Sequence, residues 1–173
     1  MNDTLSIVDF ADWPADIFNV EATAVAATGD GFIFAFAERA DGETSTNIQW
    51  AAFDSDTLTF GAFASIPFPS PDPAQSSRPL VGMDFDSAGN LYTVSAFDPD
   101  DDNGPFTSAV WRVGRLQTNG ATAEIVLDEA PELLGRLDGL KTESVTIREV
   151  GGGVEVWIGT DDENFGGLLR VLP

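Results

Sequence analysis

The chain has 173 residues, of which 8 are basic and 29 acidic, giving a formal net charge of −21. It contains neither cysteine nor histidine. This excludes disulfides, a thiolate nucleophile, a Cys/His zinc site and a histidine general base. A surface this acidic also argues against nucleic acid as a partner, since phosphate backbones are bound through basic side chains. An apolar fraction of 43% supplies a packed core, and the length suggests one domain over 1–173.

The start of the chain has no basic leader followed by an apolar segment, so no signal peptide is expected. No apolar run approaches the roughly 18 residues that span a bilayer, so no membrane insertion is expected. As given, the chain reads as cytoplasmic, or else as the mature form of a secreted or periplasmic protein. Its acidity has two interpretations, which are adaptation to salt or solubility, and a divalent-cation site among the carboxylates.

Helical periodicity is almost absent from the chain. The one helix-like stretch is Leu127–Leu140, which Pro131 and Gly135 interrupt. The rest consists of short apolar or alternating runs separated by Gly, Asp, Asn and Pro, which is typical of an all-β chain.

The first predicted unit, approximately 1–53, contains four strand candidates. A strand over Thr4–Phe10 comes first. A second strand follows from Glu21, and then come the strongly apolar run Phe32–Ala37 and a strand that contains Trp50.

The same order recurs in two further units, approximately 54–117 and 118–173. Trp111 follows Trp50 by 61 residues, and Glu143 follows Glu21 by 122, which is twice that spacing. In the second unit, two strands begin at Thr57 and Val81, and the other two are Leu91–Ala96 and the run SAVWRVG. In the third unit, two strands begin at Ala121 and Glu143, and the other two are Val154–Gly159 and Leu168–Leu172. The apolar second strand of each unit is predicted to be buried on both faces.

Four strands per unit is the content of one β-propeller blade. Three blades cannot close a ring, since propellers have about four to eight. We therefore expect a six-bladed propeller completed by a second copy, as a homodimer with three four-stranded blades per chain. The strand Thr4–Phe10 would supply the fourth strand that the last unit lacks. A sandwich or an incomplete barrel of the same strands is the alternative.

Several phrases resemble the phytase-like esterase β-propeller family. In that family a Glu-Gly-Ile-Ala-like phrase opens a blade and an Asp-rich phrase follows the next strand. Here Glu143-Ser144-Val145 and Glu21-Ala22-Thr23 match the first phrase, and Asp161-Asp162-Glu163-Asn164 and Glu38-Arg39 match the second. The resemblance implies a propeller with metal-dependent phosphoesterase or esterase activity.

Alignment of the units places carboxylates at equivalent positions, where rotational symmetry would gather them around an axis. Glu21 and Glu143 precede the innermost strands, and Asp98 and Asp161 follow the second strands together with Arg39. Converging like charges are costly unless a cation binds or protons are retained, and Ca²⁺ would relieve them. Solvated acidic loops are the alternative.

Two acidic loops are candidate metal sites. Asp98, Asp100 and Asp102 have the spacing of the first three EF-hand ligands, without the flanking helices or the glutamate at position twelve. Three further carboxylates, those of Asp161, Asp162 and Glu163, precede a Gly-Gly pair. An ordinary acidic turn is the favoured interpretation of the first loop, and a plain tight turn alone accounts for the second.

The remaining candidates are basic and aromatic residues. Arg39 and Lys141 are candidate ligand-binding residues, although a role as salt-bridge partners of the carboxylates is favoured. Trp50 and Trp111 are expected to pack between blades rather than to stack on a ligand. No feature isolates a nucleophile, so the catalytic residues are not assigned.

Two functions are compatible with these patterns. The first is an acidic, self-assembling propeller that binds a divalent cation or a small-molecule ligand near its axis. The second is a metal-dependent phosphoesterase or esterase of the phytase-like type.

Overall fold

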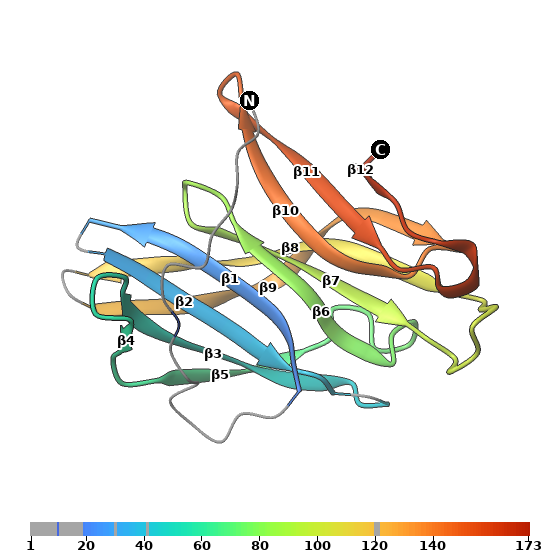
Figure 1. Cartoon of the computed structure of the whole chain (residues 1–173), viewed down its shortest axis with the longest axis horizontal. Helices are drawn as coiled ribbons and strands as arrows, with labels where there is room; N and C mark the ends of the chain where they lie inside the picture. Colours follow the sequence, from blue (N-terminus) through green and yellow to red (C-terminus); the bar gives the residue numbers. More distant parts are fainter. Residues whose placement is uncertain (1–9, 11–18, 30, 41, 120–121) are drawn as a thin grey trace.

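The computed structural model describes Phe10 and residues 19–29, 31–40, 42–119 and 122–173. Within this part of the chain, antiparallel strands form three sheets (Figure 1). The prediction of an all-β chain is confirmed. The sole helix among these residues is the three-residue 3-10 turn η1, Glu163–Phe165, and none is long and apolar enough to cross a bilayer.

Sheet A contains the first five strands. They are β1 (Val20–Thr28), β2 (Gly31–Glu38), β3 (Ser45–Asp54), β4 (Thr59–Phe60) and β5 (Ala64–Pro69). The order is β1-β2-β3, and both β4 and β5 pair with β3. Along β1, Ala22, Ala24 and Ala26 are buried while the residues between them are exposed or half-buried. This alternation is that of a strand with one packed face.

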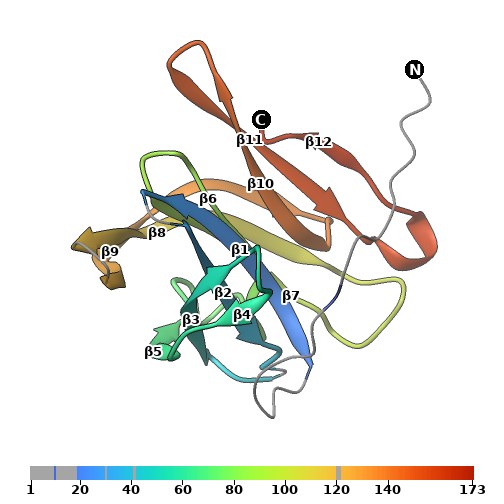
Figure 2. The same cartoon turned by 60° about the vertical axis from the view of Figure 1, so that its left-hand side comes forward.

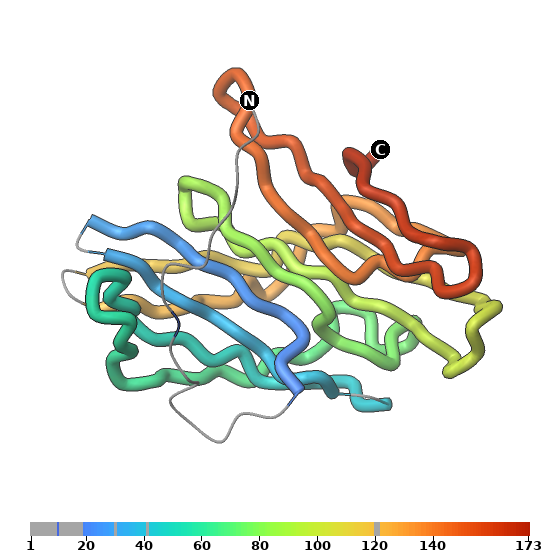
Figure 3. Tube along the Cα trace, viewed as in Figure 1, coloured from blue at the N-terminus to red at the C-terminus, as the bar shows by residue number. Residues whose placement is uncertain are grey.

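Sheet B has the order β6-β7-β8-β9 and sheet C the order β10-β11-β12. Their strands are β6 (Arg78–Phe85), β7 (Asn90–Phe97), β8 (Thr107–Asn119), β9 (Thr122–Asp138), β10 (Thr142–Val150), β11 (Gly153–Thr160) and β12 (Leu169–Val171). Every pairing is antiparallel. The colours of the chain trace show three meanders in succession (Figure 3).

The stretch Leu127–Leu140, whose spacing of apolar residues resembled a helix, is largely strand in the structure. Leu133 pairs with Trp111 of β8, and a register shift separates the pairings made by Leu127 and Glu132. Pro131 lies in this irregular part, where its missing N–H breaks no regular ladder. Pairing with the long strand β8 therefore overrides the local apolar spacing.

The sheets stack through their first strands, because β1 packs beside β6 and β6 beside β10 (Figures 1 and 2). One core cluster lies between sheets A and B and includes Trp50 and Trp111. Their exposed fractions are 6% and 7%, so the prediction that they pack between strand units is confirmed. A second cluster joins sheets B and C through Val94, Val145 and Ile158.

The predicted second strands all form, but their burial differs. Residues Leu91–Ala96 of β7 are buried throughout. In β11 most residues are half-buried and Ile158 alone is buried, so burial on both faces is wrong for that strand. Sheet B lies between two sheets whereas sheet C packs against one, and this explains the difference.

In sheet A both β4 and β5 pair with β3, and in sheet B β9 pairs with β8. Each of these strands comes from a chain segment predicted to open the following unit. Sheet C has three strands among the described residues. The predicted strand Thr4–Phe10 lies outside the described residues, apart from Phe10.

Candidate functional site

Seven charged side chains from all three sheets meet at one end of the first strands. We call them the charge cluster, which consists of Glu21, Arg39, Arg78, Asp98, Lys141, Glu143 and Glu163. Four of these residues lie in or next to the first strands, and three follow the second strands. The strand directions explain why these side chains lie together. The first residues of a first strand lie beside the last residues of its antiparallel partner, at the same end of the sheet.

Arg78, the first residue of β6, lies at the centre of the charge cluster. Its side chain is 4% exposed and pairs with Glu21 of β1 through Nη2. Glu143 of β10 accepts two hydrogen bonds, from Nη1 at 2.9 Å and from Nη2 at 3.3 Å. The Nη1 atom also lies 3.5 Å from Asp98 Oδ2. The planar guanidinium suits such a fork-like contact, and it links the first strands of the three sheets.

Lys141 is the second buried cation of the charge cluster. Its Nζ atom is 2.9 Å from Asp98 Oδ2 and 3.8 Å from Glu143 Oε1, and it also pairs with Glu163. The same atom lies 5.8 Å from the centroid of the Phe106 ring. Burial opposes the charged form of Lys141, but the hydrogen bonds to Glu163 and Asp98 outweigh it and raise the pKa of Lys141.

Asp98 shows the complementary effect. Burial works against its carboxylate, yet the hydrogen bond from Lys141, a backbone N–H from Asp100 and the nearby Arg78 together hold its pKa below the usual value. Both members of the Asp98–Lys141 pair are therefore stabilised in their charged forms.

The charge cluster is nearly, but not fully, neutralised. Its three basic side chains face four carboxylates, which leaves a formal charge of −1. Glu21 has one oxygen paired with Arg78, and its Oε1 lies 3.9 Å from Arg39 Nε. Its other oxygen, Oε2, is buried and accepts no hydrogen bond from the residues that the structure describes. One carboxylate lone-pair site thus remains unused at the edge of the cluster.

The structure brings together six of the ten predicted site residues, namely Glu21, Arg39, Asp98, Lys141, Glu143 and Glu163. The preference for Arg39 and Lys141 as salt-bridge partners matches the contacts that they make.

The other four predicted residues lie elsewhere. Asp100 and Asp102 are exposed on the loop after β7, where the Asp100 backbone N–H donates to Asp98 Oδ1 at 3.0 Å. Asp161 is exposed. Asp162 is buried and accepts hydrogen bonds from Lys141 N and Thr160 Oγ1, each at 2.7 Å, so it fixes the loop after β11. Across the described ranges, no group of three or more acidic side chains is arranged to hold a metal ion.

Arg78 is the residue whose role the sequence did not predict. No equivalent basic residue occurs at its aligned position in the other units. A usable signal exists, since Arg78 is the only basic residue between Arg39 and Arg112. A lone cation in so acidic a segment is a natural partner for converging carboxylates.

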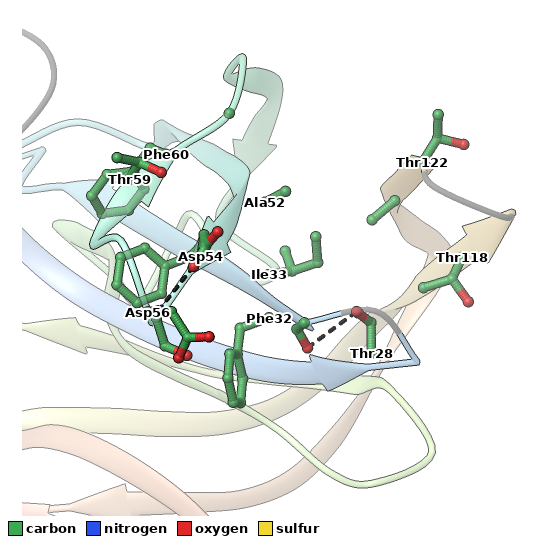
Figure 4. A pocket seen from close by; sticks show the side chains of 15 residues that line it. Thr28, Phe32, Ile33, Ala52, Asp54, Asp56, Thr59, Phe60, Thr118 and Thr122 are labelled. Atoms are coloured by element: carbon green, nitrogen blue, oxygen red, sulfur yellow. Dashed lines mark hydrogen bonds between the residues drawn. The ribbon is translucent and has the colours of Figure 1, made fainter.

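A separate depression of about 590 Å³ lies at the opposite end of sheet A (Figure 4). Its walls include Phe32 of β2 and Phe60 of β4, with Asp54 and Asp56 at its rim. Asp54 accepts the backbone N–H groups of Asp56 and Thr57, at 2.9 and 3.1 Å. These hydrogen bonds lower the pKa of Asp54, so this carboxylate serves to hold the β3–β4 turn.

Comparison of the chain with protein-family models, curated proteins and solved structures found no match. The functional argument therefore rests on the charge cluster and the stacking of the sheets.

Proposed function

We propose that this chain is half of a six-bladed β-propeller, that a second copy completes the ring, and that the charge cluster forms a ligand site near the axis. The observation that carries the proposal is the arrangement of the first strands. β1, β6 and β10 lie side by side, and each begins an antiparallel meander that runs outward. Such meanders, arranged around their first strands, are the blades of a propeller.

The charge balance indicates the kind of ligand. Each copy would bring a cluster of formal charge −1 to the axis, where the two clusters would face each other. The buried Oε2 of Glu21 offers an unused acceptor there. A hard divalent cation such as Ca²⁺, or a small cationic molecule, would offset the charge and use this oxygen.

The phytase-like esterase is the second candidate. The observation in its favour is that three of the chain's eight basic residues, Arg39, Arg78 and Lys141, gather in the charge cluster. Bound cations would activate water and offset the charge of a phosphoester. A phosphate would have to compete with Glu143 and Asp98 for Arg78 and Lys141, which favours cation binding over hydrolysis.

Thermal melting of the purified chain with CaCl₂ or with a chelator tests the ligand site. Ca²⁺ at about 100 times its dissociation constant adds about 2.7 kcal/mol of stability, which raises the melting temperature by several degrees. Glu21→Gln should abolish this rise, whereas Asp102→Asn, which removes an exposed carboxylate outside the charge cluster, should retain it. No rise for the wild type, or an equal rise for Glu21→Gln, would contradict the proposed site.

An assay with p-nitrophenyl phosphate and p-nitrophenyl acetate separates the two candidates. The binding function predicts no Ca²⁺-dependent turnover. Turnover that is lost in Glu143→Gln would instead establish the esterase.

A further inference from the structure

The outer edge of β12 in sheet C is open. Leu168 O at one end of this strand and Leu172 N at the other are hydrogen-bonded to β11, at 2.9 and 2.8 Å. Backbone groups alternate in direction along an antiparallel strand, so the N–H and C=O groups of Leu169 and Val171 point away from β11. Within the described part of the chain, no strand pairs with this edge (Figure 2). An edge of this kind is a template for pairing with another chain segment.

The side chains of β12 fit an apolar segment that carries acidic residues. Leu169 and Val171 are 72% and 40% exposed. Arg170 lies between them, and its Nε is 3.5 Å from Val171 O of the same strand. Among the described residues Arg170 forms no salt bridge, although the chain has 29 acidic residues and 8 basic ones. An acidic segment along β12 would pair with this cation and cover the two apolar side chains.

Sheets A and B show which segments cover a third strand in this fold. The outer edge of β3 pairs with β4 and β5, and that of β8 pairs with β9. These covering strands begin within the runs 57–67 and 121–131, which open the second and third units. The corresponding run of the first unit is 4–14. The repeat therefore matches the run 4–14 with β12, the third strand that no described strand covers.

The sequence of the run 4–14 is complementary to this edge. It reads TLSIVDFADWP, with Asp9 and Asp12 as its charged residues. Its first four residues alternate between polar and apolar, which is typical of a strand. Its charge is opposite to that of Arg170, and opposite charges on neighbouring strands stabilise their pairing.

We propose that the run 4–14 of one copy forms the fourth strand of sheet C in a second copy, and reciprocally. This inference rests on the proposed propeller assembly and names the segment that joins the two copies. In that assembly sheet A of one copy follows sheet C of the other, and the run 4–14 precedes β1 of sheet A. Within a single chain, sheet B separates sheet A from sheet C. Exchange of identical segments between two copies is a closed, twofold contact.

Cross-linking between two single-cysteine variants tests the exchange, because the native chain has no cysteine. In sheet A, Ala64 of β5 pairs with Trp50 of β3, and the aligned positions are Ala11 and Leu169. Chains with Ala11→Cys and chains with Leu169→Cys are co-expressed under different tags and treated with a short bismaleimide. We expect a covalent dimer that contains one chain of each kind.

The matched control uses Leu133→Cys in place of Leu169→Cys. Leu133 is 45% exposed and lies on β9, which already covers the third strand of sheet B. Thiols held side by side react at a much higher effective concentration than thiols on freely diffusing chains. Ala11→Cys should therefore give at least about tenfold more covalent dimer with Leu169→Cys than with Leu133→Cys.

The native mass of the same sample before cross-linking separates the failures. A native dimer with no more cross-linked product than the control overturns the strand exchange and leaves the propeller assembly standing. A link formed within one chain of the double variant A11C/L169C shows that each chain covers its own β12, which also overturns the exchange. A native monomer overturns both the exchange and the assembly.

Val171→Pro is an independent check. Proline removes the outward N–H of Val171, whereas Leu168 and Leu172 keep their hydrogen bonds to β11. The variant should retain the strand content of the wild type in circular dichroism and shift the native mass from dimer toward monomer. An unchanged dimer would contradict the exchanged strand.

Discussion

Arg78 holds carboxylates from two other sheets while its own side chain is 4% exposed. Removing one partner of a buried ion pair costs about 3–5 kcal/mol, because the remaining charges stay buried without compensation. Arg78→Met, which keeps an apolar stem, should therefore lower the free energy of unfolding by about this amount in urea denaturation.

The control for this variant is Arg148→Met. Arg148 also pairs with a carboxylate, that of Glu155, but its side chain is 67% exposed. Exposed pairs contribute about 0–1 kcal/mol, so this variant should remain close to the wild type. Equal destabilisation of the two variants would show that the charge cluster does not stabilise the fold.

Asp98 and Lys141 predict how stability depends on pH. The pKa of Asp98 is lowered from 3.8, so its contribution is present above that pH and is lost as the pH falls through the folded-state pKa. The pKa of Lys141 is raised from 10.5, so its contribution is present below that pH and is lost as the pH rises beyond it.

The comparison of the wild type with Asp98→Asn measures the acidic limb. The difference in unfolding free energy should be constant between about pH 6 and 8 and shrink below about pH 4. Asp102→Asn, an exposed control, should stay within about 0.5 kcal/mol of the wild type at neutral pH. A difference that grows on acidification would contradict the assigned charge pairing.

For individual residues, the alignment of the three units predicted the carboxylates that recur at equivalent positions. It placed Glu21 and Glu143 at equivalent positions before the first strands, and the structure joins both to Arg78. Spacing within a single loop was a poorer guide, because Asp100 and Asp102 follow Asp98 in sequence but stay in solvent. Arg78 has no counterpart in the other units, so alignment could not point to it.

Among the elements, β6 packs against the first strands of both neighbouring sheets, and Gly82 lies close to β10. A Cβ at this position would lie 2.9 Å from Ser144 Cα and 3.2 Å from Glu143 O. These are backbone atoms, so the strands would have to separate. Gly82→Ala should destabilise the fold by about 1–3 kcal/mol.

Gly61→Ala is the matched control for urea unfolding, since its new Cβ would meet nothing nearer than Ala52 at an ordinary 3.7 Å. If Gly82→Ala and Gly61→Ala had the same free energy of unfolding, the packing of sheet B against sheet C would not depend on the close approach at Gly82.

The sequence predicted the strands well where glycine turns separate apolar runs. Phe32–Ala37 falls within β2, and Leu91–Ala96 within β7. Leu127–Leu140 was misread because its apolar spacing is local, whereas its conformation is decided by pairing with β8. The short strand β4 had no periodic signal, since two residues cannot carry one.

For the whole molecule, the net charge of −21 opposes association of two copies. Added salt screens this repulsion between the two copies. The dimer should therefore tighten as NaCl is raised from about 0.02 to 0.5 M, as measured by sedimentation equilibrium. A dimer that weakens with salt would instead be held by opposite charges across the interface.

The sequence alone does not determine how many sheets the proposed ring would contain, for a physical reason. Repeat content determines how many sheets one chain supplies, whereas the angle between successive sheets determines how many close a circle. Sheets A, B and C stack through β1, β6 and β10, and the proposed ring would continue in the same direction.

The native mass of the wild-type chain at micromolar concentration, determined by light scattering during gel filtration, tests the central claim most directly. We expect a single species at twice the chain mass of 18.4 kDa. A stable monomer across the concentration range would contradict the half-propeller and the ligand site that depends on it.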